Sequence, residues 1–280
     1  MNIQWYPGHM AKAKRMLNDH VRLVDMVIEL LDARIPRSSH NPDLEGLLQT
    51  KDRIVILNKS DLADSHTLAL WINWYRERGI DALPFVSTQK HGNKEAMKRI
   101  HQIVQSKVDQ FRERKGIYKT IRAMVVGIPN VGKSAFINLL AGSNRAKTGN
   151  KPGVTRGKQW IKIGPYFEIM DSPGLLWPKF EDEETAKHLA YIGTIKDELM
   201  DPIELCVSLL LELKQIYPEG VLSRYNLDQF PEDGYRTLEE ICRKRGWIMS
   251  GGLPDLERGA KTVIDEFRST KLGRISLEKP

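Results

Sequence analysis

The sequence has few cysteines and no long apolar run, and both absences narrow what it can encode. Its two cysteines, Cys206 and Cys242, form no CxxC pair and stand beside no histidine cluster, so neither a disulfide framework nor a cysteine-ligated metal is expected. This usage fits a reducing, cytoplasmic compartment. No apolar segment approaches the ~20 residues that cross a bilayer. Internal repeats and low-complexity tracts are also missing.

An excess of basic residues is the main compositional signal. Lys and Arg number 43 against 36 Asp and Glu, which gives a net charge of +7. Such a balance favours a polyanionic partner, although solubility alone would explain it about as well. Hydrophobic residues make up 41% of the 280 residues, enough for a packed core, and the length suggests two domains.

Short apolar runs alternate with amphipathic stretches as far as Gly174. The apolar runs predict strands at 24–31, 53–57, 83–86, 121–126, 160–163 and 167–170. Helices are predicted at 64–79, 93–114 and 133–141. This alternation predicts an α/β fold with a mainly parallel sheet.

The pattern changes after Trp177 and Pro178. From there the periodicity is helical, and helices are predicted at 205–216, 237–245 and 255–267. We therefore expect two domains: residues 1–178 with the α/β fold, and residues 179–280 as an all-helical domain.

Residues 127–134, Gly-Ile-Pro-Asn-Val-Gly-Lys-Ser, match a phosphate loop between a predicted strand and a predicted helix. Gly132 permits the tight turn, so that backbone amides such as those of Asn130 and Val131 can cradle phosphates at the helix N-terminus. Lys133 is expected to reach the outer phosphates and to act in catalysis, and Ser134 is expected to ligate Mg²⁺.

A second motif, Asp171-Ser172-Pro173-Gly174, follows the predicted strand at 167–170. Asp171 is expected to hold Mg²⁺, and the amide of Gly174 to contact the γ-phosphate. Alone, such a motif usually marks only a turn, so its place behind a phosphate loop is what makes it informative. Thr155 lies between the two motifs. In GTPases a mobile threonine at this place completes the Mg²⁺ shell and acts in hydrolysis, and we expect Thr155 to do the same. A plain polar loop residue is the alternative for Thr155.

A base-reading motif, Asn58-Lys59-Ser60-Asp61, ends the predicted strand at 53–57. Asp61 can accept two hydrogen bonds from guanine that adenine cannot donate, so adenine would leave a carboxylate unpaired. Asn58 is expected to contact guanine and tie the loop together, and the Lys59 stem to pack on the ring. Ser87 and Thr88 are candidates for a second base loop.

The order of these motifs is reversed. In an ordinary GTPase the phosphate loop precedes the base motif, whereas here Asn58 comes before Gly127. The domain is therefore circularly permuted. The chain after Gly174 runs directly into the helical domain, so we expect nucleotide state to reorient residues 179–280.

These residues together resemble the circularly permuted GTPases, and two further segments resemble one branch of them, the ribosome biogenesis GTPase A (YlqF) family. The two segments are Trp5-Tyr6-Pro7-Gly8-His9-Met10 and Asp32-Ala33-Arg34-Ile35-Pro36. The resemblance covers the whole chain. It implies a factor in late assembly of the large (50S) bacterial ribosomal subunit, whose GTP hydrolysis the subunit stimulates and whose helical domain touches rRNA. We expect GTP or GDP and the large subunit as partners, and a monomer that binds no membrane.

Two positions differ from the Ras-like scheme. Leu175 stands where Ras-like enzymes carry a water-positioning glutamine, and an aliphatic group cannot orient water. His9 is our candidate for that task, to which the resemblance also points, and a structural histidine is the alternative. Asn130 resembles the asparagine of GTPases in which K⁺ takes the place of an arginine finger.

Basic residues recur on the predicted C-terminal helices, where the resemblance places RNA contact. They are Arg243, Lys244, Arg245, Arg258, Lys261 and Arg268. Such a band could neutralise RNA phosphates. A solvated helix face is the alternative.

Two other functions stay open on the sequence. One is a nucleotide-gated RNA-binding switch with negligible catalysis, since the glutamine is absent. The other is a GTPase of tRNA modification or membrane signalling, although the chain carries neither a membrane-anchoring motif nor a modification-enzyme domain.

Overall fold

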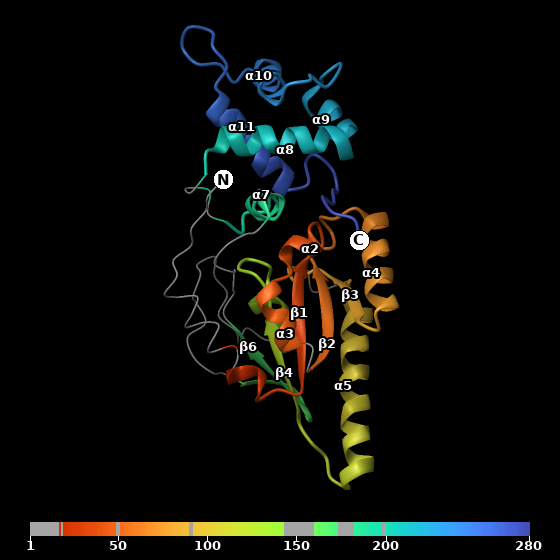
Figure 1. Ribbon diagram of the computed structural model, residues 1–280. Helices are drawn as coiled ribbons and strands as arrows, with labels where there is room; N and C mark the ends of the chain where they lie inside the picture. Colours follow the sequence, from red (N-terminus) through yellow and green to blue (C-terminus); the bar gives the residue numbers. More distant parts are fainter. Residues whose placement is uncertain are drawn as a thin grey trace. The chain divides into compact units, whose positions relative to one another are not determined.

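Two compact units make up the chain in the computed structural model (Figure 1). The structure describes residues 17, 19–48, 51–89, 92–142, 160–172, 182–195, 197 and 200–280. The sheet unit spans residues 2–179 together with 278–280, and the helical unit spans residues 180–277.

A six-stranded sheet forms the centre of the sheet unit in its described part, with the order β3-β2-β1-β4-β6-β5. The strands are β1 (Met26–Asp32), β2 (Asp52–Asn58), β3 (Asp81–Phe85), β4 (Ile121–Val126), β5 (Trp160–Gly164) and β6 (Phe167–Asp171). All neighbours pair in parallel except β5 and β6, which are antiparallel. The predicted α/β class with a mainly parallel sheet is therefore confirmed.

Helices connect the strands of this sheet. They are α2 (Pro36–Ser39), η1 (Pro42–Leu44), α3 (Glu45–Leu48), α4 (Ser65–Glu77), α5 (Lys94–Lys115) and α6 (Lys133–Leu140). The carboxylate of Asp64 caps α4 by accepting from the Thr67 amide at 2.7 Å, and Gly116, with φ of 71°, ends α5. The short α2 and α3 carry no helical periodicity and were not predicted.

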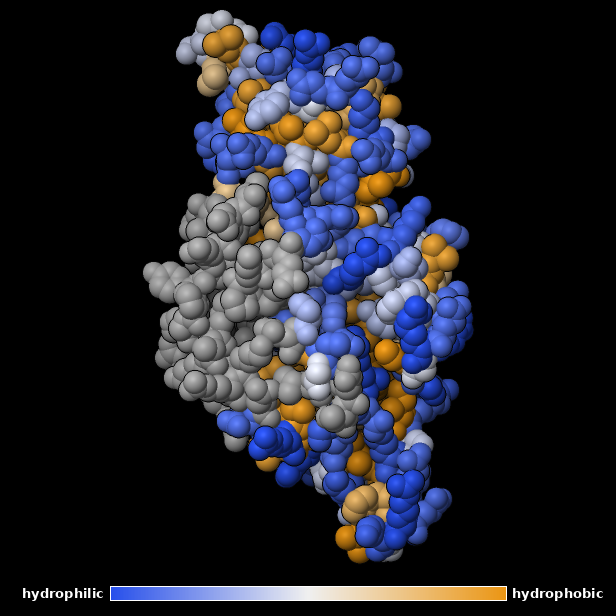
Figure 2. Space-filling view, in the orientation of Figure 1, coloured by the Kyte–Doolittle hydropathy of each residue, from blue (hydrophilic) through white to orange (hydrophobic). Residues whose placement is uncertain are grey.

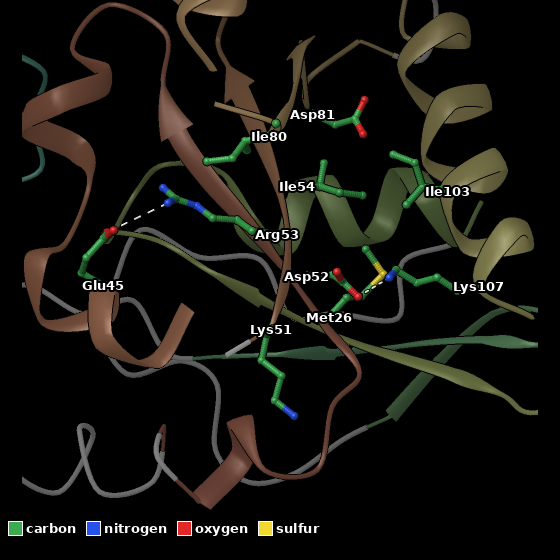
Figure 3. A pocket seen from close by; sticks show the side chains of 11 residues that line it. Met26, Glu45, Lys51, Asp52, Arg53, Ile54, Ile80, Asp81, Ile103 and Lys107 are labelled. Carbon is green, nitrogen blue, oxygen red and sulfur yellow. Dashed lines mark hydrogen bonds and ion pairs between the residues drawn. The ribbon is translucent and has the colours of Figure 1, made fainter. Parts of the chain in front are cut away.

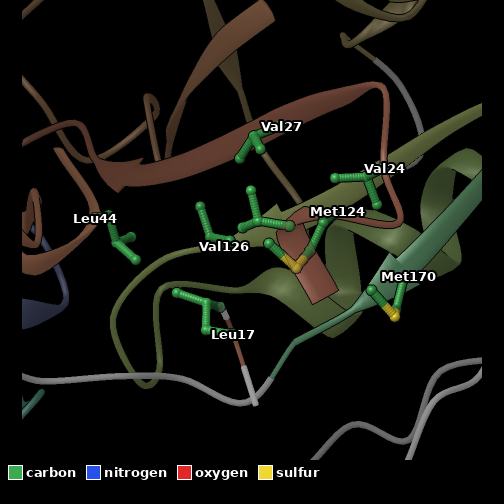
Figure 4. Packing of buried hydrophobic residues seen from close by; sticks show 8 residues of the cluster. Leu17, Val24, Val27, Leu44, Met124, Val126 and Met170 are labelled. Carbon is green, nitrogen blue, oxygen red and sulfur yellow. The ribbon is translucent and has the colours of Figure 1, made fainter. Parts of the chain in front are cut away.

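Apolar side chains cover the sheet around β1, every residue of which is buried. One cluster joins β1 to β4 and β6 and includes Val27, Met124 and Met170 (Figure 4). A second, around Leu31 and Trp71, joins β1 to β2 and α4. Because parallel strands buried by helices need apolar residues throughout, the strands appear in the sequence as continuous apolar runs.

The helical unit contains α7 (Glu183–Tyr191), α8 (Pro202–Ile216), α9 (Pro218–Tyr225), α10 (Gly234–Arg245) and α11 (Leu256–Arg268). Aspartates cap α7, α8, α10 and α11 by accepting hydrogen bonds from first-turn amides. Helix α8 begins earlier than its predicted start at residue 205, because Asp201 caps it and Pro202 occupies its first position. Among the described residues no helix is long and apolar enough to cross a membrane.

The end of the chain departs from the expected division at residues 179–280. Residues 278–280 belong to the sheet unit, and Leu277 is the last residue of the helical unit. The Glu278 carboxylate accepts a hydrogen bond from the Arg37 amide at 2.7 Å, and the Glu278 carbonyl accepts one from Trp71 Nε1 at 3.1 Å. The sheet unit therefore has a discontinuous sequence.

Candidate nucleotide site

The predicted nucleotide-binding residues lie at one edge of the sheet. Strands β1, β2, β3, β4 and β6 run parallel, so their carboxyl ends meet there. Asn58 ends β2, Ser87 follows β3, Gly127 follows β4 and Asp171 ends β6. Open α/β sheets bind ligands at this edge. Adjacency in the sheet, rather than order along the chain, brings these loops together.

Two glycines of the phosphate loop have no room for a side chain. Gly127 has φ of 148°, and a Cβ there would lie 2.5 Å from the carbonyl oxygen of Leu30. Gly132 has φ of 103°, and a Cβ there would lie 2.4 Å from Asn58 Nδ2. Both the backbone conformation and the close approach therefore require glycine.

Lys133 is held inside the phosphate loop. Its Nζ donates to the carbonyl oxygens of Gly127 at 3.0 Å and Ile128 at 2.7 Å. Burial lowers the pKa of Lys133 to about 8, and the nearby Asp171 carboxylate offsets only part of this effect. An ammonium has three N–H donors, so the third can reach a phosphate while the other two fix the side chain.

Ser134 and Asp171 lie together at the start of α6. Ser134 Oγ donates to Asp171 Oδ2 at 3.0 Å, and Asp171 is 8% exposed. A hydroxyl and a carboxylate beside a phosphate site are the hard oxygen ligands that Mg²⁺ takes. The donor set therefore fits Mg²⁺, which GTPases in general use.

The side chain of Asn58 connects three loops. It is buried, and its Nδ2 donates to the carbonyl oxygen of Val131 in the phosphate loop at 2.6 Å. Its Oδ1 accepts from the amide and the hydroxyl of Ser87, at 3.0 and 2.9 Å. The loops after β2, β3 and β4 are thereby fixed to one another.

Lys59 is oriented by an acidic residue of the neighbouring strand. Its backbone has φ of 58°, and its Nζ lies 3.1 Å from Asp32 Oδ2. Asp32 also accepts two hydrogen bonds at 2.9 Å from the guanidinium of Arg34. Burial alone would raise the pKa of Asp32, but the charges of Arg34 and Lys59 hold it far below its usual range. Asp32 is thus a charged anchor for the base motif.

Sequence reasoning did not identify this role of Asp32. The available signal was the acid–base pair within Asp32-Ala33-Arg34, but the loop that it supports depends on which strands are neighbours. Asp61 lies partly exposed near Arg34, as a base-reading residue must, and Thr88 is exposed. Both stay predicted nucleotide contacts.

Three predicted residues lie outside the described part of the chain. They are His9, Thr155 and Gly174.

A separate pocket opens at the opposite, amino edge of the sheet, where β1, β2 and β3 begin (Figure 3). Two of its cations, Lys107 and Arg53, are paired with Asp52 and Glu45. The described residues of the predicted nucleotide site lie at the carboxyl edge instead, so this pocket is not part of the candidate site.

The predicted RNA-binding residues lie on two helices of the helical unit. Arg243, Lys244 and Arg245 form the last turn of α10, and Arg258 and Lys261 are exposed on α11. Some are engaged locally. Lys261 pairs with Glu257 at 2.5 Å, Arg245 donates to the Arg224 carbonyl at 2.9 Å, and Lys244 lies 3.8 Å from Asp228.

Arg268 differs from the others because it holds the end of α7. Its guanidinium donates at 2.8 Å to each of the carbonyl oxygens of Tyr191 and Ala190, and it pairs with Asp197 at 2.7 Å. These carbonyls end a helix and need donors. The guanidinium of Arg268 therefore already makes its hydrogen bonds and its ion pair within the helical unit.

The lowered pKa of Lys133 predicts that GDP binding takes up a proton in alkaline solution. A phosphate beside the amine favours the ammonium, so the pKa of Lys133 rises on binding. Below about pH 7 the amine is already charged, and no uptake is expected; at about pH 8.5 more than half a proton should be taken up, and affinity should fall as pH rises further. Calorimetry in two buffers of different ionisation enthalpy measures this uptake.

Lys133→Arg is the matched control, because a guanidinium stays protonated throughout this range. The variant should bind GDP without proton uptake. Equal uptake by both proteins at alkaline pH would show that another group titrates.

Comparison with known proteins gives full-length matches. The chain is 45% identical to "Ribosome biogenesis GTPase A" of Priestia megaterium, covering 100% of this chain and 98% of that protein. It is 30% identical to the protein of the same description from Thermotoga maritima, with coverage of 99% and 95%. "Mitochondrial ribosome-associated GTPase 1" of Bos taurus is 31% identical, with coverage of 99% and 88%.

A family model described as "50S ribosome-binding GTPase" matches residues 122–219, beginning in β4 just before the phosphate loop. Two solved structures share the fold over nearly the whole chain. A GDP-bound YlqF has a TM-score of 0.69 and 26% identity, with coverage of 95% and 99%, and the GNP-bound YlqF of T. maritima has a TM-score of 0.67 and 26% identity, with coverage of 96% and 98%. In this chain the base motif precedes the phosphate loop, and the loops that carry both motifs meet at the carboxyl edge of the sheet. Together with this arrangement, the full-length matches show that the chain belongs to the ribosome biogenesis GTPase A family and is a GTPase.

Proposed function

We propose that this protein hydrolyses GTP as an assembly factor for the large ribosomal subunit and is activated by that subunit and its rRNA. The observation that supports this most is the bridge from Asn58 to Val131 and Ser87, which joins a guanine-reading loop to a phosphate loop. Relatives whose names describe ribosome biogenesis support the ribosomal partner. The two buried free thiols support a reducing, cytoplasmic compartment. We propose that the protein acts as a monomer.

Guanine is read by the loop after β2. Asp61 accepts two hydrogen bonds from the base, and the Lys59 stem, directed by Asp32, packs on the ring. Ser87 and Thr88 border the same face. Adenine cannot supply the two donors, so it would leave Asp61 unpaired.

The phosphates are held by the loop from Gly127 to Ser134. Its amides and Lys133 neutralise the charge that develops as the γ-phosphoryl group leaves. Ser134, Asp171 and Thr155 would hold Mg²⁺, which supplies further neutralisation when bound. The amide of Gly174 would contact the γ-phosphate and lose that contact after hydrolysis.

His9 positions the attacking water in this proposal. Leu175 replaces the usual glutamine and has no donor or acceptor, so another polar group must orient the water. Asn130, whose backbone has φ of 59°, is the proposed neighbour of a K⁺ ion that assists phosphoryl transfer.

RNA binding is assigned to the helical unit, residues 180–277. In Figure 2 hydrophilic residues gather over α10 of this unit. The exposed Arg243, Arg258 and Lys261 are the residues best placed to meet phosphates, with Lys244 and Arg245 beside the first of them. Arg268 contributes indirectly, by holding α7 in place.

Reversal of charge on α11 should weaken binding to the large subunit. The variant Arg258→Glu with Lys261→Glu should bind purified subunits about 10-fold to 100-fold more weakly at moderate salt, with a shallower salt dependence, because phosphate contacts are lost. Sedimentation of labelled protein with subunits measures this. GDP affinity should not change.

The matched control reverses two exposed lysines of α5 in the sheet unit, Lys94→Glu with Lys98→Glu. It alters the net charge by the same amount and should keep subunit binding. If both double variants bind subunits as the wild type does, RNA contact through α11 is wrong.

GTP turnover should rise when large subunits are added, and His9→Ala should remove most of this rise. Loss of a water-positioning group should lower stimulated turnover by about 100-fold, while GDP affinity and subunit binding stay intact. Turnover is measured with and without purified subunits in K⁺ buffer. An unstimulated wild type would favour a nucleotide-gated binding switch instead.

A further inference from the structure

A buried carboxylate near the end of the chain lies outside the residues assigned to the nucleotide. Glu278 is 5% exposed, and its carboxylate accepts from the amides of Arg37, at 2.7 Å, and Ser38, at 3.1 Å, and also from the Ser38 hydroxyl. The Lys279 carbonyl accepts from Arg37 Nη2 at 2.9 Å, and Trp71 Nε1 donates to the Glu278 carbonyl. The tail is thus fixed by side-chain and backbone contacts within the sheet unit.

These contacts complete the N-terminus of α2. The residue at its N-cap position is Ile35, which makes no side-chain cap hydrogen bond, and Pro36 occupies the first helical position. Arg37 and Ser38 then carry the amides that a capping side chain normally satisfies. Glu278 supplies that cap from the far end of the sequence, as a charge-assisted acceptor of the kind that makes stronger hydrogen bonds.

Helix α2 in turn supports the base motif. Ser39, its last residue, accepts a hydrogen bond from the Asp32 amide at 3.0 Å through its Oγ. The carboxylate of Asp32 holds Lys59, as described above. The backbone adds a second connection, because the Ala33 amide donates to the Asn58 carbonyl at 2.9 Å. The turn from Asp32 to Ser39 therefore lies between the tail and the guanine-reading loop.

We propose that Glu278 is a positioning residue for guanine recognition: by capping α2 it fixes the Asp32 turn that orients Lys59 in the base motif, two residues before Asp61. Glu278 directly follows Leu277, the last residue of the helical unit, so the chain of that unit leads straight into this cap. Docking of the tail and binding of guanine nucleotide are therefore linked, and each favours the other to the same degree. This inference rests on the proposed function in one respect, the assignment of Asp61 to guanine.

The test compares affinities for GDP and IDP in the full chain and in Glu278→Ala. Inosine lacks the exocyclic amine that Asp61 is expected to bind, so a loosened base motif should cost GDP more than IDP. We expect GDP affinity to fall about fivefold to 20-fold, at the lower end of the range for linked sites, and the ratio of GDP to IDP affinity to fall with it. A purely structural role would lower both affinities alike and leave the ratio unchanged.

Hydrogen exchange of the Arg37 and Ser38 amides reports directly on the tail. In the wild type, GDP should slow exchange at both amides, and in Glu278→Ala both should exchange faster than in the wild type. Lys279→Ala is the control, because it removes only a side chain and leaves the carbonyl that accepts from Arg37. It should match the wild type in affinity, ratio and exchange.

Faster exchange at Arg37 and Ser38 with an unchanged ratio of GDP to IDP affinity would overturn the inference, as would exchange that GDP does not slow. If Glu278→Ala does not fold, Glu278→Gln replaces it; this variant keeps the shape and loses the charge, and the ratio should fall in the same direction. A wild type that binds neither GDP nor IDP would instead contradict the proposed function, so the two failures are distinguishable.

Discussion

The amide side chain of Asn58 is the contact on which the nucleotide site depends. It is buried, donates to the phosphate loop at Val131 and accepts from the loop at Ser87, so one side chain fixes three loops at once. Those loops follow β2, β3 and β4, and Val131 of the phosphate loop comes 73 residues after Asn58. A permuted chain cannot rely on sequence order to bring its motifs together. The parallel sheet provides the shared edge, and Asn58 sets the loops at that edge relative to one another.

The permutation also determines where the helical unit is covalently connected to the nucleotide domain. One covalent connection follows Asp171, the proposed metal ligand at the end of β6, and the other is the step from Leu277 to Glu278. In our proposal the first leads to the residues that hold the phosphates, and the second leads, through α2 and Asp32, to the residues that read the base. An insertion between these two points could then respond to either end of the nucleotide. A helical extension attached at one end only would have a single route.

Local sequence predicted the elements whose signal is local. The apolar run at 121–126 corresponds to β4, and the glycine-rich loop lies between β4 and α6 as predicted. Helix α2 was missed because it has four residues and takes its cap from a glutamate 240 residues away, a relation that no window of sequence contains. Arg268 was grouped with the RNA-binding residues because its charge is visible in the sequence, whereas the carbonyls that it satisfies are set by helix packing. The partners of Asp32 depend in the same way on strand order.

The most direct test of this account is the GDP affinity of Asn58→Asp. The change keeps the shape of the side chain and the oxygen that accepts two hydrogen bonds from Ser87. It replaces the amide nitrogen that donates to the Val131 carbonyl with a second oxygen, which can only accept. Loss of one buried hydrogen bond, with repulsion in its place, should weaken GDP binding by about 10-fold to 100-fold. The exposed Asn73→Asp makes the same chemical change away from the site and should bind GDP as the wild type does. Equal GDP affinity for Asn58→Asp and the wild type would contradict the claim that this bridge assembles the site.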